Sequence, residues 1–441
     1  MSAVQEFRYL APSTAGAGGV ALQTSGGPAA NPCFFAGFLT TPPAAAAGLL
    51  AVADVARTRY FQPRDPASLD PVVTGSTDRL RFESFSGCGG VYARLDILPP
   101  GLDGEHAGHG TTNVDVNPPL RESLARVAGL DPLHLSVGPD ALTAATMTGT
   151  VVEKKVPLPP RWLRGFAEVH VLSAGFDRRA ELSPAEASAF LRRLPAATDR
   201  STLWAVPAGR TLRLTSRPAP GAICLAGAGR LAALRPLLRY CSGLRVYGPH
   251  TVAGSPPVPS AWEVQTGALR LTLTLSPETH RGFSGEGAAL TALAGDDVTD
   301  DADLVSALLS WDPTIDVAAL AGAAGLPVAR VRAALAQLGT AGRVGYDVAE
   351  AGYFHRVMPY DAGRAERDNP RLAGARALVE AGAVALDGAA VATVRSGDQV
   401  YRVRRLPDGA LTCSCPWQGK HRGTRGPCKH ALAVTIAGGQ S

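Results

Sequence analysis

Several short runs in the first 295 residues alternate regularly between hydrophobic and polar positions. Three of them have the two-residue period of strands: residues 91–98 ("VYARLDIL"), 166–172 ("FAEVHVL") and 268–275 ("ALRLTLTL"). Two others have a helical period: residues 184–194 ("PAEASAFLRRL") and 230–241 ("RLAALRPLLRYC"). Because both kinds interleave between many Gly and Pro residues, we predict a mixed α/β region over residues 1–295, of either the α/β or the α+β type.

Further along the chain the spacing of apolar residues becomes helical. Asp316 is placed to cap a helix that runs to Gly322, and Pro327 suits the start of the next helix. The apolar face of this next helix consists of Val328, Val331, Leu335 and Leu338. The segments "RVGYD" and "YFHRV" then have the pattern of two strands. This order resembles a winged helix-turn-helix, which we predict over residues 296–362.

The predicted winged helix has few side chains with which to contact base edges. Its second helix carries only Arg330, Arg332 and Gln337 as long polar residues. A recognition helix in the major groove uses several such side chains. The segment could therefore equally be a winged helix that packs against protein or one that contacts DNA.

The last part of the chain is predicted to be a third unit over residues 366–441. A polar joint at 361–368 leads into a helix that ends near Gly382. Three short strands follow, "AVATVRS", "QVYRVRRL" and "ALTCSC", separated by "GD" and "PDG" turns. Together with the preceding regions, this unit makes an α+β protein of several domains.

Two pairs of metal-binding residue types lie close to the C-terminus. Cys413 and Cys415 form a C-x-C pair on the last strand, where alternation directs both sulfurs to the same side. After twelve further residues, Cys428 and His430 form a C-x-H pair at the start of the helix-like segment "ALAVTIA". Two ligands from a strand end and two from a helix start can complete the tetrahedron of a zinc ion, Zn²⁺. His421, between the pairs, is the alternative fourth ligand.

This zinc ion is predicted to be structural, so we expect no enzymatic activity. A catalytic zinc needs an open coordination position and a neighbouring acid or base, and no Asp or Glu follows Asp408. In a reducing compartment structural disulfides are disfavoured, so clustered thiols there indicate metal ligands or redox groups. Since "MSAVQEFRYL" is not an export signal and no apolar run is long enough to span a membrane, we predict a cytoplasmic protein.

The net charge of the 441-residue chain, +5, is concentrated in the last unit. From Arg395 onward there are eight Lys and Arg residues and two Asp residues, which gives +6 and leaves −1 for the rest of the chain. Such local positive charge favours contact with phosphate groups. The residues predicted to contact nucleic acid are those nearest to the metal ligands: Lys420, Arg422, Arg425 and Lys429.

The pattern C-x-C, twelve residues, C-x-H resembles the SWIM zinc finger. This resemblance implies a β-β-α fold with zinc bound by Cys413, Cys415, Cys428 and His430. The segments "TTNVDVN", "RGFSGEG" and "GRVGYD…YFHR" extend the similarity to bacterial SWIM zinc finger family proteins, and the low Lys content with much Ala and Gly is typical of a GC-rich bacterial genome. The family implies zinc binding together with contact to DNA or protein, and no established catalysis.

Three functions follow from these features. DNA recognition by the finger is favoured by the charge of the last unit. A protein-interaction scaffold in a larger assembly is the alternative, because the predicted recognition helix is poor in polar side chains. The third is a nucleotide-binding enzyme, since "GAICLAGAGRLAAL" places Gly227 and Gly229 between a strand and a helix, but the acidic residue expected about 20 positions later is absent.

Two further motifs have less specific interpretations. Glu105, His106, His109 and Asp115 could form a hydrolytic metal site, although a solvated loop over 99–119 is the interpretation we favour. Within it, Asn113, Asp115 and Asn117 could bind a cation, but capping and turn bonds explain them more simply. Residues 281–287 ("RGFSGEG") are predicted to form a loop whose glycines let the backbone approach a neighbouring segment.

Overall fold

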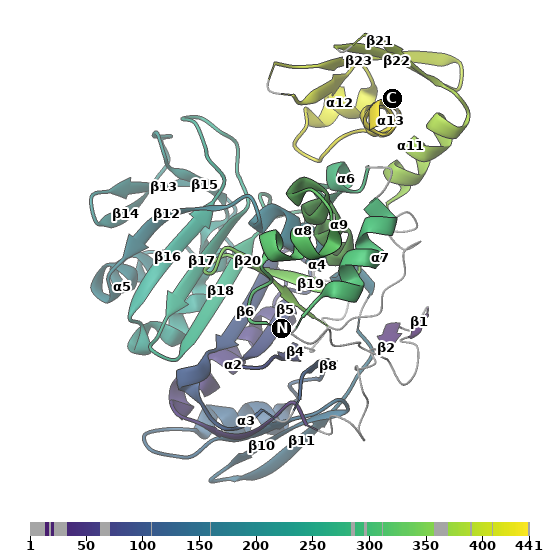
Figure 1. Ribbon diagram of the computed structural model, residues 1–441. Helices are drawn as coiled ribbons and strands as arrows, with labels where there is room; N and C mark the ends of the chain where they lie inside the picture. Colours follow the sequence, from purple (N-terminus) through teal and green to yellow (C-terminus); the bar gives the residue numbers. More distant parts are fainter. Residues whose placement is uncertain are drawn as a thin grey trace.

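The computed structural model describes most of the chain, and its elements are drawn in Figure 1. The described residues are 14–16, 19–21, 33–61, 71–106, 108–158, 160–283, 287–294, 298–310, 312–356, 369–388, 390–407 and 409–439. The joint predicted at 361–368 lies outside them, as do the boundaries predicted at 295–296 and 362–366.

An antiparallel sheet of eight strands forms the centre of the molecule, in the order β12-β16-β17-β18-β6-β5-β4-β8. Its strands are β12 (Asp177–Leu182), β16 (Gly243–Gly248), β17 (Ser260–Gln265), β18 (Leu269–Leu275), β6 (Val91–Ile97), β5 (Leu80–Phe85), β4 (Val72–Gly75) and β8 (Gly110–Asn113). The strands predicted at 91–98 and 268–275 are neighbours at its centre. Because neighbouring strands run antiparallel, this region belongs to the α+β type.

Smaller sheets and several helices surround the central sheet. A five-stranded sheet consists of β11 (Gly149–Lys154), β10 (Ala141–Thr146), β9 (His134–Val137), β3 (Phe35–Leu39) and β7 (Leu102–Glu105). A three-stranded sheet consists of β14 (Thr211–Thr215), β13 (Thr202–Ala208) and β15 (Ile223–Ala226), and β1 (Thr14–Gly16) pairs with β2 (Gly19–Ala21). The α-helices are α2 (Pro42–Arg57), α3 (Pro118–Arg126), α4 (Pro160–Ser173), α5 (Pro184–Arg192) and α6 (Ala289–Ala292), and the 3₁₀ helices are η1 (Pro99–Gly101) and η2 (Ala228–Tyr240).

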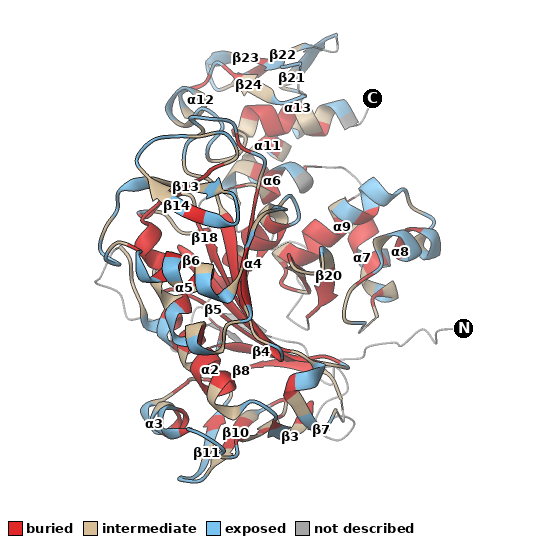
Figure 2. Cartoon of the chain, turned by 90° about the vertical axis from the view of Figure 1, so that its left-hand side faces the viewer, coloured by how far each residue is buried: buried red, intermediate tan, exposed pale blue. Residues whose placement is uncertain are grey.

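Alternation along the central strands gives the sheet two unlike faces. In β6, Ala93 and Leu95 lie in the largest hydrophobic core, against α2. Tyr92 points to the opposite face, where it packs with Phe166 of α4. Helices therefore cover both faces, and β5, β6 and β18 are buried along their whole length (Figure 2).

The prediction of a strand at 166–172 is wrong, because these residues lie in helix α4. Trp162, Phe166 and Val169 are all buried, at positions that share one side of a helix. The alternation in "FAEVHVL" matches a two-residue period only over a short window. The longer helical spacing that begins at Trp162 determines the structure.

The prediction of a loop over residues 99–119 is also wrong in part, because this segment contains the two strands β7 and β8. Strand β8 is buried at the edge of the eight-stranded sheet. A Cβ on Gly110 would lie 2.5 Å from the ring of Phe34, so glycine serves here for close packing rather than for a turn.

Three helices and a hairpin follow the central region: α7 (Val298–Leu308), α8 (Val317–Ala324), α9 (Val328–Thr340), β19 (Val344–Asp347) and β20 (Gly352–His355). Asp316 caps α8 as predicted, since its Oδ1 accepts hydrogen bonds from the amides of Ala318 (2.9 Å) and Ala319 (3.0 Å). Helix α9 packs against α4, α7 and α8. It buries Val331, Leu335 and Leu338 of the predicted apolar face, whereas Val328 stays 40% exposed.

None of the described helices is by itself long and apolar enough to cross a membrane. Helices α8 and α9 reach that composition only as a pair, and they are bent by 103° at the break between them.

A buried ion cluster joins the hairpin β19–β20 to the charged face of the central sheet. Asp347 ends β19 and contacts Arg94 of β6 (2.8 Å) and Arg270 of β18 (2.8 Å). Arg81 of β5 and Asp96 of β6 lie beside them, 3.1 Å apart. Burial opposes ionisation of Asp347, but the three arginines outweigh it and hold the pKa of this carboxyl well below its ordinary value. We call these five residues the ion cluster.

The chain ends in a helix, a four-stranded meander and two further helices. They are α11 (Pro370–Glu380), β21 (Val384–Asp387), β22 (Val391–Ser396), β23 (Gln399–Arg405), β24 (Leu411–Cys413), α12 (Pro416–His421) and α13 (Lys429–Gly439). The helix predicted to end near Gly382 ends at Glu380. The structure adds β21 to the three predicted strands and α12 to the segment between the two metal-binding pairs. In Figure 1, this meander lies on the far side of α13 from the central sheet.

Candidate metal centre

The four predicted ligands come from three neighbouring elements. Cys413 is the last residue of β24, and Cys415 is the N-cap of α12. Cys428 directly precedes α13, and His430 lies in the first turn of that helix. The prediction that both sulfurs of the C-x-C pair leave one strand is therefore wrong, because the chain has already turned toward α12 at Cys415.

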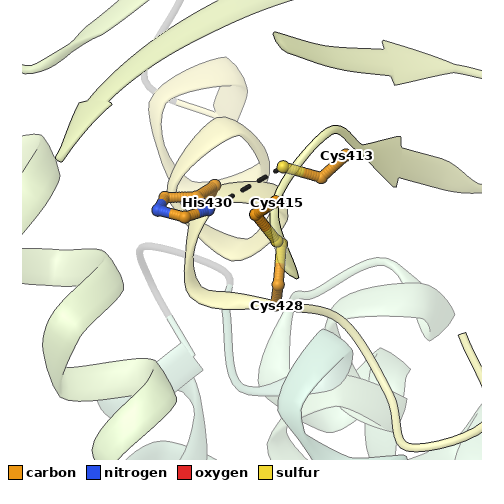
Figure 3. Close-up of side chains that lie close together, drawn as sticks. All are labelled: Cys413, Cys415, Cys428 and His430. Atoms are coloured by element: carbon orange, nitrogen blue, oxygen red, sulfur yellow. Dashed lines mark hydrogen bonds between the residues drawn. The ribbon is translucent and has the colours of Figure 1, made fainter. Parts of the chain in front are cut away.

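These side chains converge on one point, as Figure 3 shows. Their ligand atoms all lie within 4.8 Å of one another, and the Sγ of Cys413 is 3.8 Å from the Nδ1 of His430. All four residues are buried, with exposed fractions between 2% for Cys428 and 7% for Cys413. The two pairs thus form one enclosed group of donors.

The geometry and the chemistry of this group fit zinc. Zinc bonds of about 2.0 to 2.3 Å in a tetrahedron separate the ligand atoms by about 3.3 to 3.8 Å, which matches the distance between Cys413 and His430. Three thiols with one imidazole are a donor set that zinc prefers. A cation would also offset the repulsion among buried thiolates. The residues present can therefore hold Zn²⁺ as a complete set of four protein ligands.

The hydrogen bonds of the group favour one thiolate, at Cys428. The contact with the Cys413 thiol lowers the pKa of Cys428 to about 4 against the opposing effect of burial, and His430 and the Ala431 amide add to this. The same contact and burial raise the pKa of Cys413, and burial raises that of Cys415. The amide of Ala431 lies 3.4 Å from the Cys428 sulfur. A backbone donor thus stabilises the charge that a metal requires.

Two side chains that the sequence did not indicate support the ligands. The ring of Tyr401 stacks on that of His430, with centroids 4.2 Å apart. Arg371 of α11 donates hydrogen bonds from Nη1 to the carbonyl oxygens of Arg425 (2.6 Å) and Pro427 (2.9 Å). These bonds hold the backbone that leads into Cys428. In the sequence, the alternation of Tyr401 with polar residues along β23 is only a weak indication that its ring points inward. No local pattern in the sequence distinguishes Arg371 from the other arginines.

The loop at 281–287 contacts the finger, and this confirms the prediction of a close backbone approach. A Cβ on Gly426 would lie 2.2 Å from the carbonyl oxygen of Gly287. Gly287 in turn donates a hydrogen bond to Glu168 of α4 (2.9 Å). Residues 284–286 of this loop lie outside the described part of the chain. The segment before Cys428 is thus seated on α4 through Gly287.

The alternative ligand and the predicted DNA-binding residues have different surroundings. His421 ends α12 with its ring 4.4 Å from that of Trp417, and it does not belong to the ligand group. Lys420 and Arg422 are exposed. Arg425 and Lys429 are only half exposed, and the guanidinium of Arg425 lies 5.3 Å from the Trp417 ring. Two of these four cations are therefore exposed to solvent, and the other two are partly covered.

The other candidate sites have no such convergence. Among the described residues, Cys413, Cys415, Cys428 and His430 are the one group of metal-ligand side chains that comes together, so Glu105, His106, His109 and Asp115 do not form a second. Asn113 donates to the carbonyl oxygen of Val156, and Asn117 donates to Glu153 (2.8 Å). These two asparagines serve the local structure.

The glycine turn before η2 is packed against protein. A Cβ on Gly227 would lie 2.5 Å from Thr279, and one on Gly229 would lie 2.2 Å from the carbonyl oxygen of Ala196. In a dinucleotide site the corresponding space holds a pyrophosphate. Here the glycines allow protein segments to meet.

Comparison with known proteins identifies the C-terminal segment. Residues 401–439 match the SWIM zinc finger family, so this part of the chain is a SWIM zinc finger, as its ligand spacing predicted. No curated protein matches the sequence.

Two solved structures are similar to part of the chain. One is proliferating cellular nuclear antigen from Entamoeba histolytica, with 12% identity, 56% of this chain and 99% of that chain covered, and a TM-score of 0.37. The other is the PCNA2-PCNA3 complex from Sulfolobus tokodaii, with 10% identity, 56% and 100% coverage, and a TM-score of 0.38. Both TM-scores are low, so neither similarity assigns a fold or a function to this chain.

Proposed function

We propose that this protein binds zinc as a structural ion and that its SWIM finger recognises DNA. The observation that carries the proposal is the charge of the finger, which is +6 from Arg395 onward against −1 for the remaining residues. Duplex DNA carries one negative charge for about every 1.7 Å of its axis, and lysine and arginine contacts to phosphate provide most of the affinity that does not depend on sequence.

The proposed role of zinc is structural and not catalytic. Four protein ligands fill a tetrahedron and leave no position for a substrate. No carboxylate of the described residues belongs to the group. When bound, the ion would supply folding energy by joining β24, α12 and the start of α13. The seven free cysteines are consistent with a reducing compartment, and we place the protein in the cytoplasm.

We further propose that residues 296–362 form a winged helix that packs against protein. Support comes from the order of α7, α8 and α9 followed by the hairpin β19–β20, and from the bridge that pairs Ile315 with Tyr353 beside this hairpin. Helix α9 corresponds to a recognition helix, but it packs on α4, and Gln337 is buried. Arg330 is engaged by Asp301 at 2.7 Å. These contacts leave little of α9 available for a DNA groove.

A protein-interaction scaffold is the second candidate function. It is favoured by a groove of about 330 Å³ between the meander and the end of α13, which is lined mainly by apolar residues such as Leu386, Leu411 and Val434. Leu386 is 42% exposed. Exposed apolar grooves are a common feature of protein-binding surfaces.

One experiment on the full-length protein distinguishes these two functions. Zinc is measured by elemental analysis, and binding to a short labelled duplex is measured by fluorescence anisotropy at about 0.15 M salt. We expect one zinc per chain and measurable DNA affinity at this salt concentration. No affinity, together with a protein partner that stays bound after nuclease treatment, would establish the scaffold instead.

A further inference from the structure

One face of the finger sheet carries arginines that the metal centre does not use. Along β23, Tyr401 and Val403 point inward, since Tyr401 stacks on His430 and Val403 is buried. Alternation therefore places Arg402 and Arg404 on the opposite, outer face. The register with β22 places Arg395 on the same outer face, opposite Val400.

The outer face has a net positive charge and is open. Arg395, Arg402 and Arg404 are exposed, and none of them pairs with a carboxylate of the described residues. The register places Asp387 of the edge strand β21 on this face as well, so three arginines and one aspartate give +2. Figures 1 and 2 show the meander above α13, so its outer side points away from the rest of the described chain.

The loop that was predicted to bind DNA is less open than this face. Arg425 lies over Trp417, and its carbonyl oxygen is held by Arg371. The neighbouring Gly426 meets the backbone of Gly287. The end of the loop therefore faces the central part of the protein, and of the four predicted cations only Lys420 and Arg422 are exposed.

We propose that the outer face of the meander, with Arg395, Arg402 and Arg404, is the surface that binds the phosphate backbone of duplex DNA. This proposal rests on the proposed function and assigns it to a surface. Thr393 and Thr412 lie opposite Arg402 and Arg404 and add hydroxyl groups, which also bind phosphate. A sheet face with guanidinium and hydroxyl groups offers several donors to the phosphates of a regular helix.

The aromatic residues of the finger favour a duplex over a single strand. Proteins that bind single strands stack bases on exposed aromatic rings. In this finger, Tyr401 is turned inward onto His430, and Trp417 is covered by Arg371 with its guanidinium 4.5 Å from the ring. Contact with the phosphate backbone is the interaction that the outer face can make.

The test replaces the three arginines by glutamine in the full-length protein. R395Q/R402Q/R404Q is compared with the matched control R192Q/R193Q/R213Q, which removes the same charge from exposed positions far from the finger in sequence. Affinity for a short labelled duplex is measured from about 0.05 to 0.2 M salt. The slope of log K against log salt is negative, and each lost phosphate contact lowers its magnitude by about 0.9, so we expect the magnitude to fall by about 2 to 3 for the outer-face variant and to change little for the control.

Further measurements separate the possible failures. A zinc content of one per chain in the outer-face variant verifies that its finger is folded. If this variant loses zinc, the single variant R402Q is tested in its place, and the magnitude of its salt slope should fall by about 0.9. If the salt dependence of DNA binding is lost in K420Q/R422Q and unchanged in the outer-face variant, the assignment of DNA binding to the outer face is overturned. The proposed function would still hold in that case. Equal competition by polyglutamate at the same charge concentration overturns the choice of DNA as the partner. No DNA binding by the unmodified protein overturns the proposed function itself.

Discussion

The zinc centre and the ion cluster both collect ionisable side chains away from water, but they balance charge in different ways. The ion cluster contains three arginines and two aspartates, and Glu350 offsets the remaining +1 through a contact with Arg270 (3.0 Å). The metal centre gathers three cysteines and a histidine and includes no arginine or lysine. A cation from solution would supply the positive charge when all three thiols ionise.

This difference determines what each region needs in order to fold. The ion cluster forms when distant parts of the chain meet, since Arg81 and Asp347 are separated by most of the central region. The metal centre lies within one short segment and would gain its stability from a bound ion. Removing one partner should therefore have consequences of different size and extent in the two regions.

The largest effect is expected when the metal centre loses a ligand. Cys428→Ser should reduce zinc from one per chain to near zero, because a structural zinc contributes on the order of 10 kcal/mol to a small finger. Elemental analysis measures the metal, and hydrogen exchange should show that the finger opens while β6 and β18 stay protected. Cys33→Ser is the matched control, since its Sγ bonds the carbonyl oxygen of Phe35 (2.9 Å), as a serine hydroxyl can. Retention of zinc by Cys428→Ser would contradict the ligand assignment.

The next largest effect is expected from the ion cluster. Asp347→Ala removes one carboxylate from the buried Arg94 and Arg270, beside which Asp96 and Glu350 remain, and it should lower the free energy of unfolding by about 3 to 5 kcal/mol. Urea unfolding followed by fluorescence measures this change. Zinc content should stay at one per chain, which separates the two regions. A loss below about 1 kcal/mol would mean that water reaches the arginines and compensates for the missing anion.

The same carboxyl should make the stability of the protein sensitive to acid. Asp347 has a folded-state pKa well below its unfolded value of about 3.9, so the folded state binds fewer protons. Its contribution is therefore complete above about pH 4 to 5 and is lost as the pH falls through the folded-state pKa. Asp347→Asn should flatten this part of the curve of urea midpoint against pH. An unchanged curve would assign the acid sensitivity to other groups.

A smaller effect is expected where the finger meets the rest of the protein. A Cβ at Gly426 would lie 2.2 Å from the carbonyl oxygen of Gly287, so Gly426→Ala should weaken this contact by about 1 to 3 kcal/mol. Gly423→Ala is the matched control, because Gly423 also has a positive φ (82°) but no atom near its Cβ position. Hydrogen exchange in α13 measures the difference between the variants. Equal effects would show that backbone conformation, and not the contact with Gly287, limits position 426.

The smallest effect is expected from an ion pair in water. Like Asp347, Glu181 contacts more than one arginine, namely Arg178 (3.0 Å) and Arg245 (3.0 Å), but its side chain is 47% exposed. Glu181→Gln should change the free energy of unfolding by less than about 1 kcal/mol, because water already solvates these charges. Urea unfolding under the conditions used for Asp347→Ala gives a direct comparison. If Glu181→Gln lowered the free energy of unfolding as much as Asp347→Ala does, burial would not explain why the two carboxylates differ in their contribution to stability.

Sequence reasoning succeeded where the physical cause is local. Helix α8 begins at the aspartate that caps it, and the zinc ligands are close enough in the chain for their spacing to indicate the metal. It failed where a short window fits two periods, as in 166–172, and where glycine serves packing rather than a turn, as at Gly110. In these cases the neighbouring element, and not the local pattern, selected the structure.

The sequence by itself determined the SWIM spacing and the concentration of positive charge beside it, and it predicted the four side chains that converge in the metal centre. Only the tertiary structure decided that Arg371 and Gly287 hold the segment before Cys428, that α9 packs on α4, and that the polar face of β6 is buried against the hairpin. A two-residue period establishes that a strand has two unlike faces, but it does not state what covers each of them. Partners hundreds of residues apart leave no local pattern, because the contact exists only after the chain has folded.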